Sequence, residues 1–335
     1  MYKNKKNKLV LLSLSIFLLA VILISFGLGK YPIEIKQVLG IIFSRIFNIE
    51  QFWTDNMETI FFKIRLPRIL LACLVGCCLS AAGAVYQGIF LNPMAAPDIL
   101  GASHGAAFGA AIAIYFYRSS REVTISAFIF SLFTVFLVYF ISKRTKGNKV
   151  LGLILAGIMI SSLFSSATSF IKLVADPNDQ LPAITYWLMG SLSGAKMSDV
   201  TFALLPMCIG LVPLILLSWH INILTIGDDE ARTMGINTKL IRLITIISAT
   251  LITSASVAVS GMIGWVGLVI PHLSRKLVGN NFVYLLPTSM IFGATFLLLV
   301  DNISRNLWTS EIPIGILTSF VGAPFFIYLI TRRGE

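Results

Sequence analysis

The densest group of reactive side chains in this chain lies in residues 227–235, between two long apolar segments. Three carboxylates in a row are followed by a guanidinium, and a glycine stands at each end. This stretch is too polar to enter a bilayer and too short to form a domain. It therefore predicts one or two helical turns at a membrane surface, with a polar face that another molecule could bind. The residues concerned are Gly227, Asp228, Asp229, Glu230, Ala231, Arg232 and Gly235.

Motifs for covalent catalysis and for metal binding are missing from the sequence. It has neither a Gly-x-x-x-x-Gly-Lys-Ser/Thr phosphate loop nor a His-Glu-x-x-His zinc motif. The three histidines, His104, His220 and His272, are far apart in the sequence. The four cysteines lie in apolar segments, where we expect them to pack as small apolar side chains. We therefore expect no catalytic residue, no metal site and no cofactor in this chain.

The composition predicts an integral membrane protein. Of 335 residues, 56% are hydrophobic and 12% are charged, about half of the charge in a soluble domain. Apolar residues occur in blocks of about 20, long enough to cross ~30 Å of hydrocarbon as helices. We predict an all-α integral membrane protein with about ten transmembrane helices and a single domain, 1–335. The expected spans are 9–28, 67–88, 96–117, 123–142, 150–173, 198–219, 239–260, 263–278, 282–301 and 313–331.

Basic residues predict the orientation. The clusters Lys3–Lys8 and Lys143–Lys149 fall on one side of these spans, which the positive-inside rule assigns to the cytoplasm together with both termini and segment 227–235. The net charge of +11 is thus mainly a matter of topology, and nothing predicts nucleic-acid binding. The first apolar run extends to Phe26, longer than the ~7–15 apolar residues of a signal peptide, so we interpret it as the first span.

Small and hydroxylated residues predict how the spans pack. Two small-residue faces should bring helix backbones close together; they are Gly76, Ser80 and Gly83, and Gly101, Gly105 and Gly109. Span 150–173 carries a run of hydroxyls that either bond back to their own helix or line a weakly polar pathway. These include Ser161, Ser162, Ser165 and Ser166. Lys172 and Asp301 fall near span ends, within reach of water, so no carboxylate is expected at the midplane.

Three sequence blocks, in order over nearly the whole chain, carry a family resemblance. The first runs from Arg65-Leu66-Pro67-Arg68 through Gln87 to Asn92-Pro93-Met94-Ala95-Ala96-Pro97. The second is 227–235, and the third is Gly261 to His272 with Arg275 after it. Together they closely resemble the FecCD/BtuC-type family of bacterial ABC importer permeases, which carry iron–siderophore, haem and vitamin B12. One departure is Met94, where leucine is common.

The resemblance implies a type II ABC importer permease fold and a set of partners. Permeases of this family have ten helices and pair with an identical or sibling permease around a central pathway. Two cytoplasmic ATPase subunits bind ATP and magnesium, and an extracytoplasmic binding protein delivers the substrate. The chain would then be a multi-pass protein of a bacterial cell membrane, and it would not itself be an enzyme.

The resemblance also implies roles for the polar turns and for three arginines. Segment 227–235 looks like the coupling helix that fits a cleft in the ATPase, and Asn92-Pro93 would contact the ATPase as well. The arginines match positions that, in this family, receive acidic residues of the binding protein. Such contacts are chemically reasonable, because a guanidinium can pair with a carboxylate through two hydrogen bonds. Interfacial anchoring is the alternative for them. They are Arg65, Arg68 and Arg305.

Two further groups of residues take their roles from the same resemblance. Gly147 and Asn148 align with the cytoplasmic gate region of the family. The third block is expected to be structural: its glycines permit a tight backbone path, Pro271 breaks the eighth span, and His272 serves as a cap or hydrogen-bond partner. The structural residues are Gly261, Gly264, Gly267, Pro271 and His272.

The resulting hypothesis is the permease subunit of an ABC importer that moves an iron chelate by alternating access, driven by a partner ATPase. A ferric siderophore is the first choice of cargo, with haem, cobalamin or an oxyanion as alternatives, because selection lies mainly in the binding protein. An ion-gradient-driven secondary transporter is the alternative function, although the sequence has no central acid to support it. A structural or signalling membrane protein, which would transport nothing, is a third.

Overall fold

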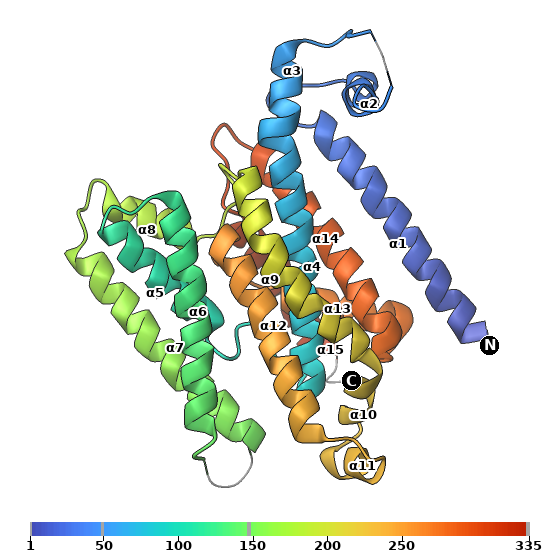
Figure 1. Ribbon diagram of the computed structural model, residues 1–335, viewed down its shortest axis with the longest axis vertical. Helices are drawn as coiled ribbons and strands as arrows, with labels where there is room; N and C mark the ends of the chain where they lie inside the picture. The colour runs from blue at the N-terminus through green and yellow to red at the C-terminus, as the bar shows by residue number, and fades with distance from the viewer. Residues whose placement is uncertain (1, 48–49, 146–148, 333–335) are drawn as a thin grey trace.

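The protein is all-helical over the residues that its computed structural model describes, 2–47, 50–145 and 149–332 (Figure 1). No β-strand occurs in those ranges, which confirms the predicted all-α class. The long helices are α1 (Tyr2–Gly27), α4 (Leu66–Ile89), α6 (Ser120–Ser142), α7 (Lys149–Val174), α9 (Met197–Leu216), α12 (Thr238–Ser260) and α14 (Phe282–Asn306). The others are α2 (Ile35–Phe43), α3 (Asp55–Thr59), η1 (Ile60–Arg65), α5 (Ala102–Tyr115), α8 (Gln180–Leu188), α10 (Ser218–Leu224), α11 (Asp228–Thr233), α13 (Val266–Val278) and α15 (Ile314–Arg332).

Each predicted apolar segment contains a helix, but the expected count of about ten spans is not confirmed. Within the described ranges, seven helices are long and apolar enough to cross a membrane. α5 and α13 have only 14 and 13 residues, about 20 Å of helix against ~30 Å of hydrocarbon. α5 is short because the chain between Asn92 and Gly101 is irregular, and Gly101 enters the helix with a φ of 77°.

α4 is the central helix of the bundle. It contacts α9, α12, α13 and α14, and almost all of its side chains are buried. Glycines make this approach possible. A Cβ on Gly76 would collide with the carbonyl of Gly293 in α14, and one on Gly83 would collide with the carbonyl of Gly267 in α13. The face predicted from the small residues of this segment is therefore confirmed as a packing surface.

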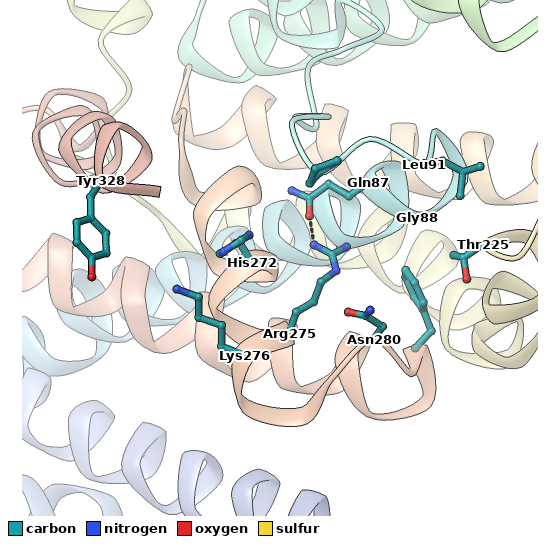
Figure 2. Close-up of a pocket in the computed structure, with 11 residues that line it drawn as sticks. Gln87, Gly88, Leu91, Thr225, His272, Arg275, Lys276, Asn280 and Tyr328 are labelled. Atoms are coloured by element: carbon teal, nitrogen blue, oxygen red, sulfur yellow. Dashed lines mark hydrogen bonds between the residues drawn. The ribbon is translucent and has the colours of Figure 1, made fainter. Parts of the chain in front are cut away.

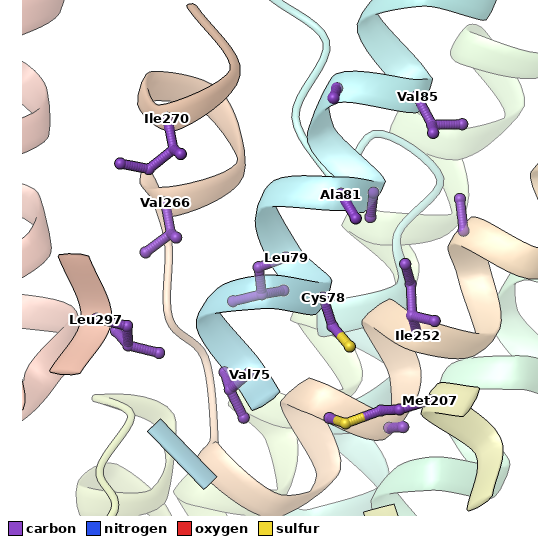
Figure 3. Packing of buried hydrophobic residues seen from close by; sticks show 14 of the residues in the cluster. Val75, Cys78, Leu79, Ala81, Val85, Met207, Ile252, Val266, Ile270 and Leu297 are labelled. Atoms are coloured by element: carbon purple, nitrogen blue, oxygen red, sulfur yellow. The ribbon is translucent and has the colours of Figure 1, made fainter. Parts of the chain in front are cut away.

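Side chains of α4 fill the space among the helices around it (Figure 3). Cys78 is completely buried and lies in one cluster with Ile252 of α12 and Met207 of α9. Val75 and Leu79 belong to the same cluster. Cys78 thus packs as the small apolar side chain that its position in an apolar segment predicts.

A second group of helices stands to one side of this core (Figure 1). α5 contacts α6, α7 and α8, and α6 joins the group to α12. A Cβ on Gly105 would collide with Thr134 of α6, and one on Gly109 would lie 2.6 Å from the carbonyl oxygen of Ser126. The second predicted small-residue face is therefore also a packing surface.

The two ends of the bundle carry different polar elements (Figure 1). α2 and α3 lie at one end, and α10 and α11 lie at the other. This arrangement separates the connection 29–66 from segment 227–235, as the order of the apolar segments predicts. α1 runs along the outside, where it contacts α13 and α14.

Candidate functional site

α11 forms from the acidic stretch and is fastened to the bundle by one small residue. Its six residues match the one or two turns predicted. Gly227 precedes the helix with a φ of 150°, in the region that favours glycine. Ala231 is completely buried, and α11 contacts α10 and α12. The helix is therefore seated on its neighbours rather than suspended in a loop.

The end of α11 is fixed by two backbone hydrogen bonds. The N–H of Ile236 donates to the carbonyl of Ala231 at 3.1 Å, and the N–H of Gly235 donates to that of Arg232 at 2.9 Å. Gly235 has a φ of 78°. This is the Schellman arrangement, in which a left-handed glycine just past the helix lets the last carbonyls find donors. Gly235 therefore ends the helix.

The described charged side chains of α11 are exposed. Asp229 has a side chain 92% exposed, and its Oδ1 lies 3.4 Å from Nη1 of Arg232. Glu230 is exposed as well. A short, capped helix thus presents acids and a guanidinium at one end of the molecule. This arrangement suits contact with another protein, and the coupling role of 227–235 stays a prediction.

A second turn at the same end follows α4. Oδ1 of Asn92 accepts a hydrogen bond from the N–H of Met94 at 2.9 Å, a local closure typical of Asn in turns. Pro93 and Met94 are exposed. α10 contacts α4, so this turn and α11 lie at the same end of the bundle. The ATPase contact expected of Asn92 and Pro93 also stays a prediction.

The glycine-rich block breaks the backbone before α13, not within it. Gly261 ends α12 with a φ of 67°, and α13 begins only after Trp265. The prediction that Pro271 breaks this segment is wrong, because α13 continues through it. Gly264 is exposed, and a Cβ on Gly267 would collide with the ring of Pro97. Close packing therefore explains Gly267, while the helix break lies at 261–265.

A side chain from α4 allows α13 to continue through its proline. Pro271 has no N–H to donate to the carbonyl four residues earlier, which belongs to Gly267. Nε2 of Gln87 lies 3.4 Å from that carbonyl oxygen and 3.3 Å from that of Leu268, and donates to both. Oε1 of Gln87 in turn accepts a hydrogen bond from Nη1 of Arg275 (Figure 2). Gln87 thus supplies the missing donor and positions a guanidinium.

His272 follows the proline and lies beside α15. It is half-buried, and its ring centroid lies 6.2 Å from that of Phe325. It lines the same cavity as Arg275 (Figure 2). The structural role expected for His272 is compatible with this packing but stays a prediction.

The three arginines expected at the docking surface are all buried. Arg65 donates through Nη1 to the carbonyl of Phe26 and through Nη2 to that of Tyr31. These carbonyls lie at the end of α1 and in the connection after it. Because the last carbonyls of a helix have no partner inside it, Arg65 caps α1 from the end of η1.

Arg68 holds two carboxylates. Its Nε and Nη2 both lie 2.9 Å from Oδ1 of Asp301, and its Nη1 lies 2.9 Å from Oε1 of Glu311. The side chain of Asp301 is 0% exposed, so the expectation that water reaches it is wrong. Its charge is stabilised instead by Arg68 and by Arg305, whose Nε lies 3.5 Å from Oδ2. A buried carboxylate without such partners would cost several kcal/mol.

Glu311 and Arg305 complete this outer cluster. Burial would raise the pKa of the Glu311 carboxyl, but the hydrogen bonds and charge of Arg68 outweigh it, and the pKa is lowered below its ordinary value of 4.5. Arg305 donates to the carbonyl of Ser25 at 3.2 Å and also to Oδ1 of Asn302. All three arginines are thus engaged within the chain, and their contact with a binding protein stays a prediction.

Comparison with known proteins places this chain in a family. Residues 17–332 match the model of the FecCD transport family. The chain belongs to the FecCD transport family. It is 39% identical to the molybdate import system permease protein MolB of Haemophilus influenzae, over 97% of each chain. It is 38% identical to a probable iron chelatin transport system permease protein of Helicobacter pylori, over 96% of this chain and 97% of that one.

A solved structure supports the same assignment for this FecCD-family chain. The chain superposes with a TM-score of 0.85 on an ABC transporter of metal-chelate type in an inward-facing conformation. The two are 38% identical, and the match covers 96% of this chain and 99% of that one. The fold described above is therefore that of an ABC transporter permease.

The hydroxyl run of this FecCD-family protein bonds in part to its own helix. In α7, Thr168 and Ser169 donate to carbonyls four residues earlier, at 2.8 and 3.0 Å, which is the self-bonding alternative. Others face out of the chain or contact α5. Ser162, Ser165 and Ser166 are exposed, and Ser161 lies against Gly101. Their place on a pathway stays a prediction.

Some predicted site residues lie outside the described structure, and some residues of the observed site were not found from the sequence. Gly147 and Asn148, expected at the gate, lie outside the described residues. Sequence reasoning gave no partner to Asp301, Glu311 or Gln87. Asp301 stands four residues before Arg305, a spacing that predicts a helical ion pair and could have been noticed. Glu311 and Gln87 carry no such signal, because their partners are 243 and 188 residues away.

Proposed function

We propose that this chain is the translocation subunit of an ATP-driven importer that moves a ferric chelate into the cytoplasm by alternating access. Membership of the FecCD family over almost the whole chain is the observation that carries this proposal. The chain contains no phosphate loop, so ATP would be bound and hydrolysed by a partner. Two ATPase subunits would bind below the bundle, and a substrate-binding protein would dock at the opposite end.

α11 is the element through which the ATPase would act. It is short, capped and seated by Ala231, so a push on its exposed charges would be transmitted rather than absorbed. The push would reach α12 and α10, which α11 contacts. A hinge motion in one subunit can tilt helices in another when the element between them moves as a rigid unit. In this arrangement the α11 end of the molecule faces the cytoplasm.

Docking would take place at the end that carries Arg65, Arg68 and Arg305. The described side chains of the outer cluster comprise these three arginines with Asp301 and Glu311, so positive charge exceeds negative charge by one. Lys30 adds to this excess, because its Nζ donates to the carbonyl of Thr309 close to Glu311. An excess of positive charge would attract an acidic face of a binding protein and raise its rate of association.

A ferric siderophore is the proposed cargo, and molybdate is the second candidate. The relative from Helicobacter pylori is named for iron chelatin transport, which supports the first. The relative from Haemophilus influenzae is named for molybdate import and is 39% identical, which supports the second. Haem and cobalamin remain within the chemistry expected of the sequence blocks.

Uptake by the reconstituted transporter tests this function. The permease, its ATPase and its binding protein would be placed in vesicles with radioactive ferric siderophore outside, or with radioactive molybdate. We expect accumulation of the siderophore that requires ATP and is unchanged by an uncoupler. Molybdate uptake in its place would support the second candidate. Uptake that persists without the ATPase and collapses with an uncoupler would overturn the proposal in favour of an ion-driven transporter.

A further inference from the structure

A basic cavity of about 600 Å³ lies where α4, α10, α13, α14 and α15 meet (Figure 2). Arg275 and Lys276 of α13 line it, together with the amide of Asn280. None of the described residues that line it is an aspartate or a glutamate. Among the described residues, the wall therefore carries two cations and no carboxylate to neutralise them, which favours an anion as its occupant.

The guanidinium in this cavity is held in place before any ligand arrives. Oε1 of Gln87 accepts a hydrogen bond from Nη1 of Arg275, and Gln87 is itself held by the carbonyls of Gly267 and Leu268. This contact uses one of the five N–H donors of a guanidinium. A fixed fork of donors loses little conformational entropy when it binds a phosphate or carboxylate. The cavity is thus a built site rather than a gap between mobile lysines.

The surface beside the cavity has the features expected of one that lipid borders. Nδ2 of Asn7 in α1 donates to the carbonyl of Val278, at the end of α13, at 3.2 Å. α1 therefore brings its basic first turns, with exposed Lys5, Lys6 and Lys8, to the same end of α13. Farther along α1, large apolar side chains such as Leu12 are exposed. A helix that is apolar outside and basic at one end is expected to have acyl chains along it and headgroups at that end.

We propose that this cavity binds the phosphodiester headgroup of an anionic phospholipid from the cytoplasmic leaflet. Arg275 and Lys276 would hold the phosphate oxygens, and Leu91, which also lines the cavity, would contact the apolar part of the lipid. Basic pockets between membrane helices on the cytoplasmic side recognise such headgroups. The inference rests on the proposed function only for its topology, which places the α11 end in the cytoplasm.

Native mass spectrometry of the full-length permease, released from detergent, tests this site. The probes are phosphatidylglycerol, phosphatidylcholine and inorganic phosphate. We expect the wild type to retain phosphatidylglycerol. Its affinity should fall about thirty-fold when Arg275→Gln and Lys276→Gln are combined, because each basic residue near a membrane surface raises lipid affinity about five-fold. The matched control combines Lys143→Gln and Arg144→Gln, which removes the same charge near the end of α6 and should leave retention unchanged.

A second variant guards against misfolding, because Arg275 also holds Gln87. Lys276 is exposed, so Lys276→Gln alone should fold and still weaken phosphatidylglycerol binding. Equal retention by the double variant and the wild type would overturn the proposal, as would equal binding of phosphatidylcholine. Displacement of the lipid by inorganic phosphate at millimolar concentration would overturn it in favour of a soluble anion.

Assembly with the ATPase provides a separate outcome. If the ATPase subunits expel phosphatidylglycerol from the wild type, an acidic protein surface is the true occupant and the lipid proposal fails. None of these measurements involves uptake. A permease that retains lipid as expected but transports nothing would contradict the proposed function and leave the lipid site standing.

Discussion

At Arg68, a single guanidinium joins parts of the chain that are more than 200 residues apart. Asp301 belongs to α14, and Glu311 lies in the connection before α15. Asp301 is completely buried, so removal of Arg68 would leave its charge with Arg305 alone, at a cost of about 3–5 kcal/mol. The Glu311 side chain is 27% exposed, so water can replace part of the interaction that Glu311 would lose if Arg68 were removed. The two carboxylates should therefore differ in their effect on stability.

Replacement of Glu311 should weaken the protein in a pH-dependent way. Because the folded pKa of Glu311 lies below its ordinary value of 4.5, its stabilising effect is fully present above pH 4.5 and is lost as the pH falls through the folded value. We expect Glu311→Gln to lower the free energy of unfolding by about 1.5 kcal/mol at neutral pH. The difference in Tm between the variant and the wild type in detergent should then shrink below pH 4.5.

Glu58→Gln is the matched control for this measurement. Glu58 also pairs with an arginine, Arg45, at 2.8 Å, but the Arg45 side chain is 64% exposed. An exposed pair contributes little, so this variant should keep the Tm of the wild type at every pH. A Glu311→Gln protein with an unchanged Tm would contradict the stabilising role given to the Arg68 pair.

At the scale of elements, α11 is too small to be stable alone and depends on its neighbours. An isolated helix of six residues does not form in water. Here the buried Ala231 and the two hydrogen bonds that end the helix at Gly235 hold it on α10 and α12. Its rigidity is therefore a product of tertiary packing, while its acidic face is free to contact a partner.

Replacement of residues 228–232 by a Gly/Ser linker of equal length should uncouple the transporter. The chain would still connect α10 to α12, but a flexible linker cannot transmit a displacement. We expect ATP-dependent uptake in vesicles to fall to the level measured without ATP, while binding-protein docking persists. The control combines Lys143→Gln and Arg144→Gln at the end of α6 and should transport normally. Normal uptake by the linker variant would exclude the coupling role.

At the scale of the whole molecule, the irregular backbone at 261–265 constrains what surrounds it. Gly264 is exposed in the single chain, and the chain beside it forms a hollow with Phe320 of α15. Backbone without internal hydrogen bonds is tolerated at membrane depth only where protein or water covers it. This face is therefore expected to meet the second permease or the pathway, whereas α1 meets lipid.

Cysteine cross-linking tests that arrangement. In a background with Cys208→Ser, Phe320→Cys should form a covalent dimer of permease chains on mild oxidation, because Phe320 is 74% exposed on the face that must be covered. Leu12→Cys, on the outer side of α1, should stay monomeric under the same conditions. A dimer band for Leu12→Cys and a monomer band for Phe320→Cys would contradict this arrangement. Monomer bands for both variants would favour a sibling permease as the partner.

Local signals alone determined much of this protein. Apolar blocks predicted the helices, and small-residue spacing predicted the faces on α4 and α5, because propensity and backbone approach depend on neighbouring residues. The tertiary structure decided the rest. α13 continues through Pro271, with Gln87 of α4 donating to the carbonyl that the proline leaves without a donor, and Asp301 needs no water because Arg68 lies beside it. These partners are set by packing between distant segments, which no local pattern encodes.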